Sequence, residues 1–119
     1  MKTILIIDWP SIDVPESYAR SGYQVIVKGG PGPADYSGYE CIEGVVTIRQ
    51  LGRAPDTADF VYAYRPFDEV PAIVEIAKSL QAAKLWIHGL SNAQQLEAAA
   101  LASARGIELI EFRPDDRMV

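Results

Sequence analysis

Apolar residues fall in short runs that predict buried β-strands. The predicted strands cover residues 3–7, 23–28, 44–48, 59–64, 83–88 and 107–112. The first is a continuous β-branched run, as expected for a strand covered on both faces. The last, IELIEF, alternates apolar with acidic residues, which is typical of an edge strand with one solvated face. Residues 29–40 combine glycine, proline, aspartate and serine, and we expect a loop there.

The segment 14–21 predicts a first helix, and Gly22 is suited to the position after its end. Pro15 lies inside this segment. Either the helix begins at Asp13 as its N-cap, with Pro15 in the first turn, or it begins near Pro10 and bends.

Two further helices follow the later strands. Asp68 can cap a helix whose apolar residues recur at helical spacing. This apolar stripe consists of Val70, Ile73, Val74, Ala77 and Leu80. Ser91 and Gln94 form an S-x-x-Q capping box before an alanine-rich helix that stops at Gly106.

The alternation of strands and helices predicts the fold class. Strand–helix–strand units need right-handed crossovers and give a mostly parallel sheet covered on both faces. We therefore expect a three-layer, Rossmann-like α/β domain. A chain of 119 residues is long enough for one substantial core, so residues 1–119 are expected to form a single domain.

Composition and charge exclude several function classes. The net charge of −5 argues against a nucleic-acid-binding protein, which needs clustered Lys and Arg. A single cysteine, Cys41, permits no intrachain disulfide and no cysteine-based metal site. No apolar run reaches the ~20 residues of a membrane span. The N-terminal run meets Asp8 and Pro10 too early for a signal peptide, so we expect a cytoplasmic protein with no membrane partner.

The junction after the first strand, ILIIDWPSID, is chemically unusual. In a nucleotide-binding α/β domain, a glycine-rich loop lies at this junction so that backbone N–H groups can approach a phosphate at a helix N-terminus. Here Asp8 and Trp9 occupy it, and no glycine precedes Gly22. The Asp8 carboxylate would repel a diphosphate, and Trp9 would fill space.

Three stretches together resemble the small bacterial CoA-binding domain proteins, the stand-alone version of the Rossmann domain in the succinyl-CoA synthetase α subunit. They are PSIDVPESYARSGYQVIV, LGRAPDTADFVYAYRPFDEVPAIVEIA and AKLWIHGLSNAQQLEAAALASARGIELI. The most specific features are Pro10-Ser11 leading to Gly22-Tyr23, the aromatic-Arg-Pro sequence at 64–66, and Lys84 with Trp86.

The resemblance implies a ligand site at the carboxyl ends of the strands, for CoA, an acyl-CoA or another adenine nucleotide. It also favours a first helix that begins near Pro10. This sequence departs from the family where Asp8-Trp9 replaces the glycine loop, which predicts weakened binding of the phosphates. The cofactor-binding residues that we predict are Asp8, Trp9, Pro10, Ser11, Lys28, Tyr64, Arg65, Pro66, His88 and Asn92.

Each candidate also has a simpler interpretation. Arg65 and Lys28 could contact anionic groups, or could simply be solvated residues at strand ends. Ser11 and Ser91 are more typical of helix caps. The aromatic rings of Trp9, Tyr64 and Trp86 could stack on an adenine, although the positions of Tyr64 and Trp86 within predicted strands favour the core.

The sequence favours a binding module over an enzyme. His88 is the single histidine, so no histidine cluster can hold a metal, and no nucleophile motif accompanies it. An acid–base role with Asp8 or Asp13 is the weaker hypothesis. The main prediction is a non-catalytic small-molecule-binding module. The alternative is a degenerate Rossmann domain that has lost its ligand and serves as a protein-interaction scaffold, with a homo-oligomer or a protein partner.

Overall fold

The computed structural model describes residues 2–8, 13–29 and 35–110. The strands are β1 (Thr3–Ile7), β2 (Gln24–Lys28), β3 (Tyr36–Ile42), β4 (Val45–Gln50), β5 (Phe60–Ala63), β6 (Lys84–Ile87) and β7 (Glu108–Leu109). The helices are α1 (Asp13–Arg20), α2 (Val70–Ser79) and α3 (Asn92–Ala104), and a 3-10 turn, η1 (Phe67–Glu69), precedes α2. None of the helices in the described ranges is long and apolar enough to span a membrane.

All seven strands form one sheet in the order β4-β3-β2-β1-β5-β6-β7. Strands β2, β1, β5, β6 and β7 pair in parallel. Strand β3 pairs antiparallel with β2, and β4 pairs antiparallel with β3. After β1 the chain adds β2, β3 and β4 on one side of β1. It then adds β5, β6 and β7 on the other side. The space between the ends of β1 and β5 is therefore the topological switch point, where ligands bind in open α/β sheets.

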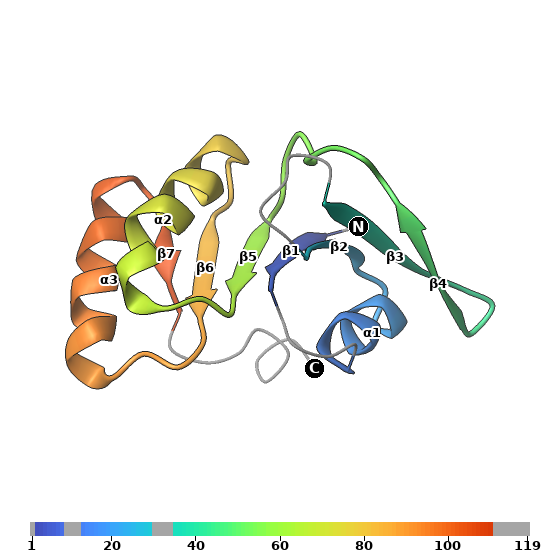
Figure 1. The fold of residues 1–119 in the computed structure, drawn as a ribbon, viewed down its shortest axis with the longest axis horizontal. Helices are drawn as coiled ribbons and strands as arrows, with labels where there is room; N and C mark the ends of the chain where they lie inside the picture. Colours follow the sequence, from blue (N-terminus) through green and yellow to red (C-terminus); the bar gives the residue numbers. More distant parts are fainter. Residues whose placement is uncertain (1, 9–12, 30–34, 111–119) are drawn as a thin grey trace.

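Helices cover both faces of the sheet, which confirms the predicted three-layer α/β class (Figure 1). On one face, Val14, Tyr18 and Ala19 of α1 pack on residues of β1, β2 and β5. On the other, the stripe of α2 and two alanines of α3, Ala98 and Ala102, form a second cluster with the sheet. The predicted α2 stripe is confirmed, since Val70, Ile73, Val74, Ala77 and Leu80 are all buried.

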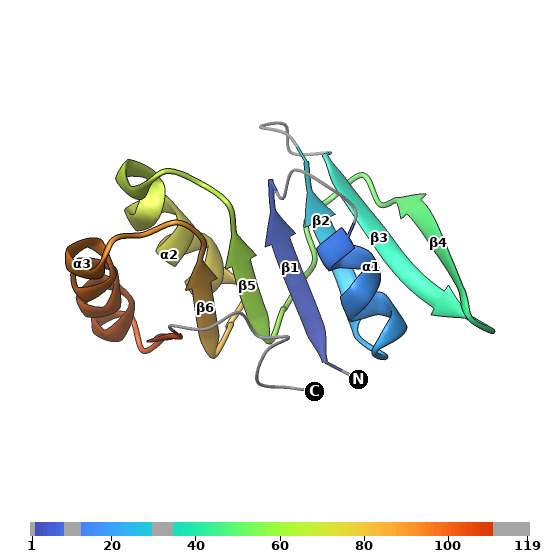
Figure 2. The same cartoon turned by 90° about the horizontal axis from the view of Figure 1, so that it is seen from below.

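The prediction of a loop over residues 29–40 is wrong from Tyr36 onward, because Tyr36–Ile42 is strand β3, and residues 30–34 of that prediction lie outside the described residues. Strand β3 forms a hairpin with β4 through Glu43 and Gly44, whose φ angles of 53° and 81° suit a type I′ turn. Gly38, which favoured a loop, has a packing role in the strand. A Cβ there would lie 3.4 Å from the Leu51 side chain, at the close limit of ordinary van der Waals contact. Figure 2 shows this hairpin at the end of the sheet away from α2 and α3.

The helix ends agree only in part with the sequence. The Ser91–Gln94 capping box is confirmed, because each residue's side chain accepts a hydrogen bond from the other's backbone N–H. The prediction that Asp68 caps α2 is wrong, since η1 already starts after Pro66 and Asp68 lies inside it. α1 begins at Asp13, and the predicted start near Pro10 lies outside the described residues. The predicted strand at 107–112 is confirmed as the edge strand β7, but it is shorter than predicted and covers only Glu108–Leu109 among the described residues; residues 111–112 of that prediction lie outside them.

Candidate functional site

A pocket of about 640 Å³ lies at the carboxyl ends of β1, β5 and β6. Its volume falls in the range of small-molecule sites, and it lies at the topological switch point. It is lined by Asp8, Tyr64, Arg65, Pro66, Phe67, His88, Gly89, Leu90 and Gln94. Parallel pairing brings its walls together, because Tyr64 N–H donates to the Ile7 carbonyl and His88 N–H to the Ala63 carbonyl.

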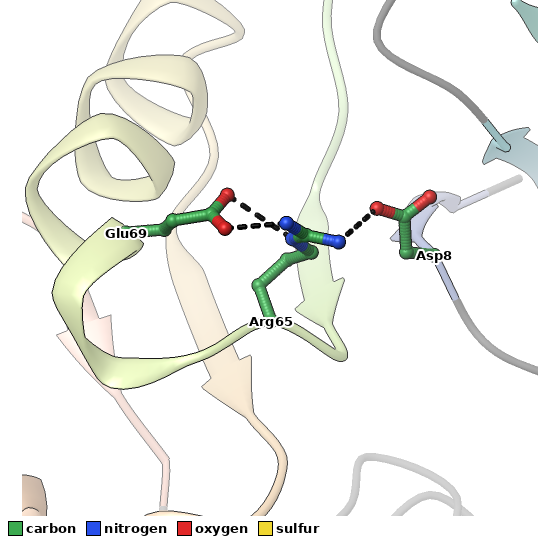
Figure 3. A network of polar contacts seen from close by, with 3 residues as sticks. All are labelled: Asp8, Arg65 and Glu69. Carbon is green, nitrogen blue, oxygen red and sulfur yellow. Dashed lines mark hydrogen bonds and ion pairs between the residues drawn. The ribbon is translucent and has the colours of Figure 1, made fainter.

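Arg65 is held between two carboxylates (Figure 3). Its Nη1 donates to Asp8 Oδ2 at 2.8 Å, and its Nε donates to Glu69 Oε1 at 3.1 Å. Nη2 also donates to Glu69 Oε2, which makes the Glu69 contact bidentate. Asp8 comes from the end of β1 and Glu69 from η1, so Arg65 connects the two sides of the switch point. The three side chains carry a formal charge of −1.

The Asp8 backbone is adapted to this position. Its φ is 55°, in the left-handed region that non-glycine residues rarely adopt, although Asp tolerates it better than most. Its N–H donates to the Lys28 carbonyl at 2.9 Å, which continues the β1–β2 pairing by one residue. The chain thus makes the turn that a glycine would make and places a carboxylate where the phosphate loop is expected.

The hydrogen bonds from Arg65 lower the pKa of the Glu69 carboxyl below its ordinary value of 4.5 and raise the pKa of Arg65. Because the folded-state pKa of Glu69 is depressed, this pair stabilises the fold above pH 4.5, and that contribution is lost as the pH falls through the lower, folded-state value. We expect a carboxyl ¹³C NMR titration to place Glu69 below 4.5 and Arg65→Gln to return it toward that value. A wild-type Glu69 that titrates at or above its ordinary value would contradict the bidentate contact.

A row of aromatic rings leads from the core to the pocket. Tyr62 stacks on Trp86 with ring centroids 5.3 Å apart, Trp86 on His88 at 5.7 Å, and His88 on Tyr64 at 4.9 Å. Tyr62 is fully buried, whereas the Tyr64 side chain is 42% exposed. Placing Tyr64 in the core is therefore wrong, because β5 ends at Ala63 and Tyr64 extends past the sheet edge. Trp86 is half-buried against the α1-side cluster, which agrees with a core role.

The structure brings together half of the predicted ligand residues. Those lining the pocket are Asp8, Tyr64, Arg65, Pro66 and His88. Lys28 and Asn92 do not line it, and the Lys28 ammonium lies over the Tyr36 ring, 6.0 Å from its centroid. Trp9, Pro10 and Ser11 lie outside the described residues.

Sequence reasoning missed several residues of this site. Phe67, Gly89, Leu90 and Gln94 line the pocket, and Glu69 binds Arg65 from beside it. The contact between Arg65 and Glu69 could have been predicted from the sequence, because the two residues are four positions apart and a helical turn brings such residues together. Gln94 was already assigned to the capping box, and its first-turn position after β6 also places it at the sheet edge.

Residues 8–113, most of the chain, match the model of a family described as a CoA binding domain. No curated protein matches the chain. In the part of the chain that the structure describes, no group of three or more His, Cys, Asp or Glu side chains could hold a metal ion. The family match agrees with the parallel sheet and with the pocket at its switch point, and the chain belongs to the CoA-binding domain family.

Proposed function

We propose that the pocket between the ends of β1, β5 and β6 binds CoA, an acyl-CoA or a related adenine nucleotide, and binds it weakly. The observation that carries this proposal is the exposed Tyr64 ring stacked on His88 beside Arg65, at the switch point of a CoA-binding domain. A planar adenine fits against such rings, and base–aromatic stacking contributes about 1–3 kcal/mol.

The charged residues fit the phosphates of CoA less well. Arg65 already donates to two carboxylates, and the three side chains together are negative. A phosphate that approaches Arg65 must displace Asp8 or Glu69 and also meets their repulsion. Ring stacking with only partial neutralisation of the phosphates supports a Kd on the order of 0.1–1 mM.

We further propose that the site binds without catalysis. The Asp8 carboxylate accepts a hydrogen bond from Arg65, so it is engaged in orienting that side chain. The ring of His88 is stacked between Trp86 and Tyr64. Both arrangements support a positioning role for the two residues that an acid–base mechanism would use.

Calorimetric titration with CoA, ADP, AMP and pantetheine tests the proposal. We expect CoA and the nucleotides to bind and pantetheine to bind least, because it lacks the adenine ring. Tyr64→Leu should weaken CoA binding by about tenfold through lost stacking. Tyr23→Leu is the matched control, since Tyr23 packs edge-to-face on Tyr18 near α1 and does not line the pocket, and it should bind like the wild type. No heat with millimolar CoA, or an unchanged Kd for Tyr64→Leu, would refute the site.

A second candidate function is a protein-interaction domain that has lost its ligand. Three large aliphatic side chains exposed on the β3–β4 hairpin, Ile42, Val45 and Ile48, favour it. The titration separates the two functions, because a ligand-free scaffold gives no heat with any of the four compounds.

A further inference from the structure

The two edges of the sheet differ in a way that matters for association. An edge strand offers unpaired backbone groups to other chains, and proteins usually blunt it by shortness, charge, proline or a bulge. β7 has two residues, one of them Glu108. β4 has six residues, pairs with β3 without a bulge, and contains neither proline nor lysine. Its single charged residue is Arg49.

The alternation of hydrogen bonds between β3 and β4 shows which residues of β4 direct their backbone N–H and C=O groups away from the sheet. Leu51 N–H donates to the Tyr36 carbonyl, which continues the Ser37–Gln50 register by one residue and makes Tyr36–Leu51 a hydrogen-bonded pair. Such pairs recur at every second residue of an antiparallel ladder. The backbone groups of residues 45, 47 and 49 therefore point toward β3. Those of residues 46, 48 and 50 point away from the sheet, and β4 has no second neighbour among the described strands.

Exposed aliphatic side chains accompany this open edge. Ile42, Val45 and Ile48 are 54%, 61% and 58% exposed, and they account for half of the large exposed apolar side chains in the described ranges. Ile42 and Val45 lie opposite each other beside the turn, and Ile48 lies at the middle of β4. When another strand pairs with this hairpin, apolar surface is removed from water, which favours association.

We propose that β4 pairs antiparallel with β4 of a second copy of this chain, which continues the sheet across a two-fold axis at Ile48. The outward groups of residues 46, 48 and 50 fit one register best. In that register Ile48 faces Ile48 of the second copy, and Val46 faces Gln50 of the second copy. All three outward residues of each strand then form hydrogen-bonded pairs, and the contact is isologous, as two-fold dimers require.

Charge complementarity favours a second copy over an unrelated strand. Glu40 faces Thr47 within the hairpin, and in the proposed register Thr47 faces Arg49 of the second copy. Glu40, Thr47 and that Arg49 lie on the same face of the continuous sheet. The two charged residues are two strand spacings apart, about 10 Å between Cα atoms, within reach of their long side chains. The two-fold axis repeats this pair, so the dimer has two complementary charge pairs.

Sedimentation equilibrium over a concentration series tests the dimer. We expect the wild type to reach twice its chain mass of 13.1 kDa. Ile48→Lys places two ammonium groups face to face at the axis and should raise the dimer Kd by about tenfold or more. Leu96→Lys is the matched control, because Leu96 is the most exposed aliphatic residue of α3, and it should dimerise like the wild type. A wild type that stays monomeric at every concentration, or an Ile48→Lys variant that dimerises normally, would overturn the proposal.

Charge reversal tests the register itself. Arg49→Glu and Glu40→Arg should each weaken self-association by about threefold to tenfold, because each dimer then contains two like-charge pairs. Mixing the two single variants should restore association, since every contact across the axis then joins opposite charges. Failure of the mixture to associate better than either variant alone would rule out this register. Circular dichroism of each variant verifies that the fold is intact. If β4 instead pairs with a different protein, the wild type, the two variants and their mixture all stay monomeric.

Discussion

Replacing Asp8 with glycine is expected to tighten the binding of CoA by about thirtyfold, which corresponds to about 2 kcal/mol. The substitution removes the carboxylate nearest the switch point and frees Nη1 of Arg65 to donate to a phosphate. It also suits the backbone, because a φ of 55° is unstrained for glycine. The result is measured by calorimetric titration of both proteins at matched ionic strength.

Two further variants test the charges around Arg65, and the first separates the charge of Asp8 from its backbone conformation. Asp8→Asn removes the charge but keeps a side chain that tolerates the left-handed region, and it should recover most of the gain in affinity. Glu69→Gln removes the other carboxylate and should tighten binding by a smaller factor, since Glu69 lies beside the pocket rather than in its lining. If Asp8→Gly weakened the binding of CoA instead, Asp8 would be a ligand contact and the proposed repulsion would be wrong.

The parallel part of the fold could be predicted because its strand residues are apolar for one reason, namely that they are buried in the core. In β1 and β5 the apolar runs are buried on both faces, and in β6 Leu85 and Ile87 are buried, so the sequence pattern and the burial coincide. The β3 strand was not predictable in the same way. Tyr36 and Tyr39 are its two buried residues, and a Cβ at Gly38 would contact the Leu51 side chain. That contact joins β3 to the residue that follows β4. It cannot be predicted when glycine is interpreted as a turn residue from its sequence neighbours alone.

The site was predictable in its position more than in its chemistry. Strand order alone brings Asp8, Tyr64 and His88 to one edge of the sheet. Whether Arg65 is available to a phosphate depends on its partners. One of these is Asp8, 57 residues earlier in the chain, and only the tertiary structure reveals that contact. The exposure of Tyr64 depends likewise on β5 ending one residue before it.

The largest stability effect is expected at Leu85, in the centre of β6. Leu85 is fully buried and lies between Val61 of β5 and Leu109 of β7. Leu85→Ala should lower the free energy of unfolding by about 3 kcal/mol, because the lost methyl groups leave a cavity between the sheet and the helices. For a domain of this size that corresponds to a fall in Tm of about 10 °C.

Leu96→Ala provides the matched control for this prediction, since it removes the same atoms from a side chain that is 75% exposed on α3. We expect its free energy of unfolding to change by no more than about 0.5 kcal/mol. Urea denaturation of both variants, followed by far-UV circular dichroism, gives the two values. Equal destabilisation of the two variants would contradict the burial of β6 between β5 and β7. That result would also weaken the placement of His88, because the same strand carries it to the pocket.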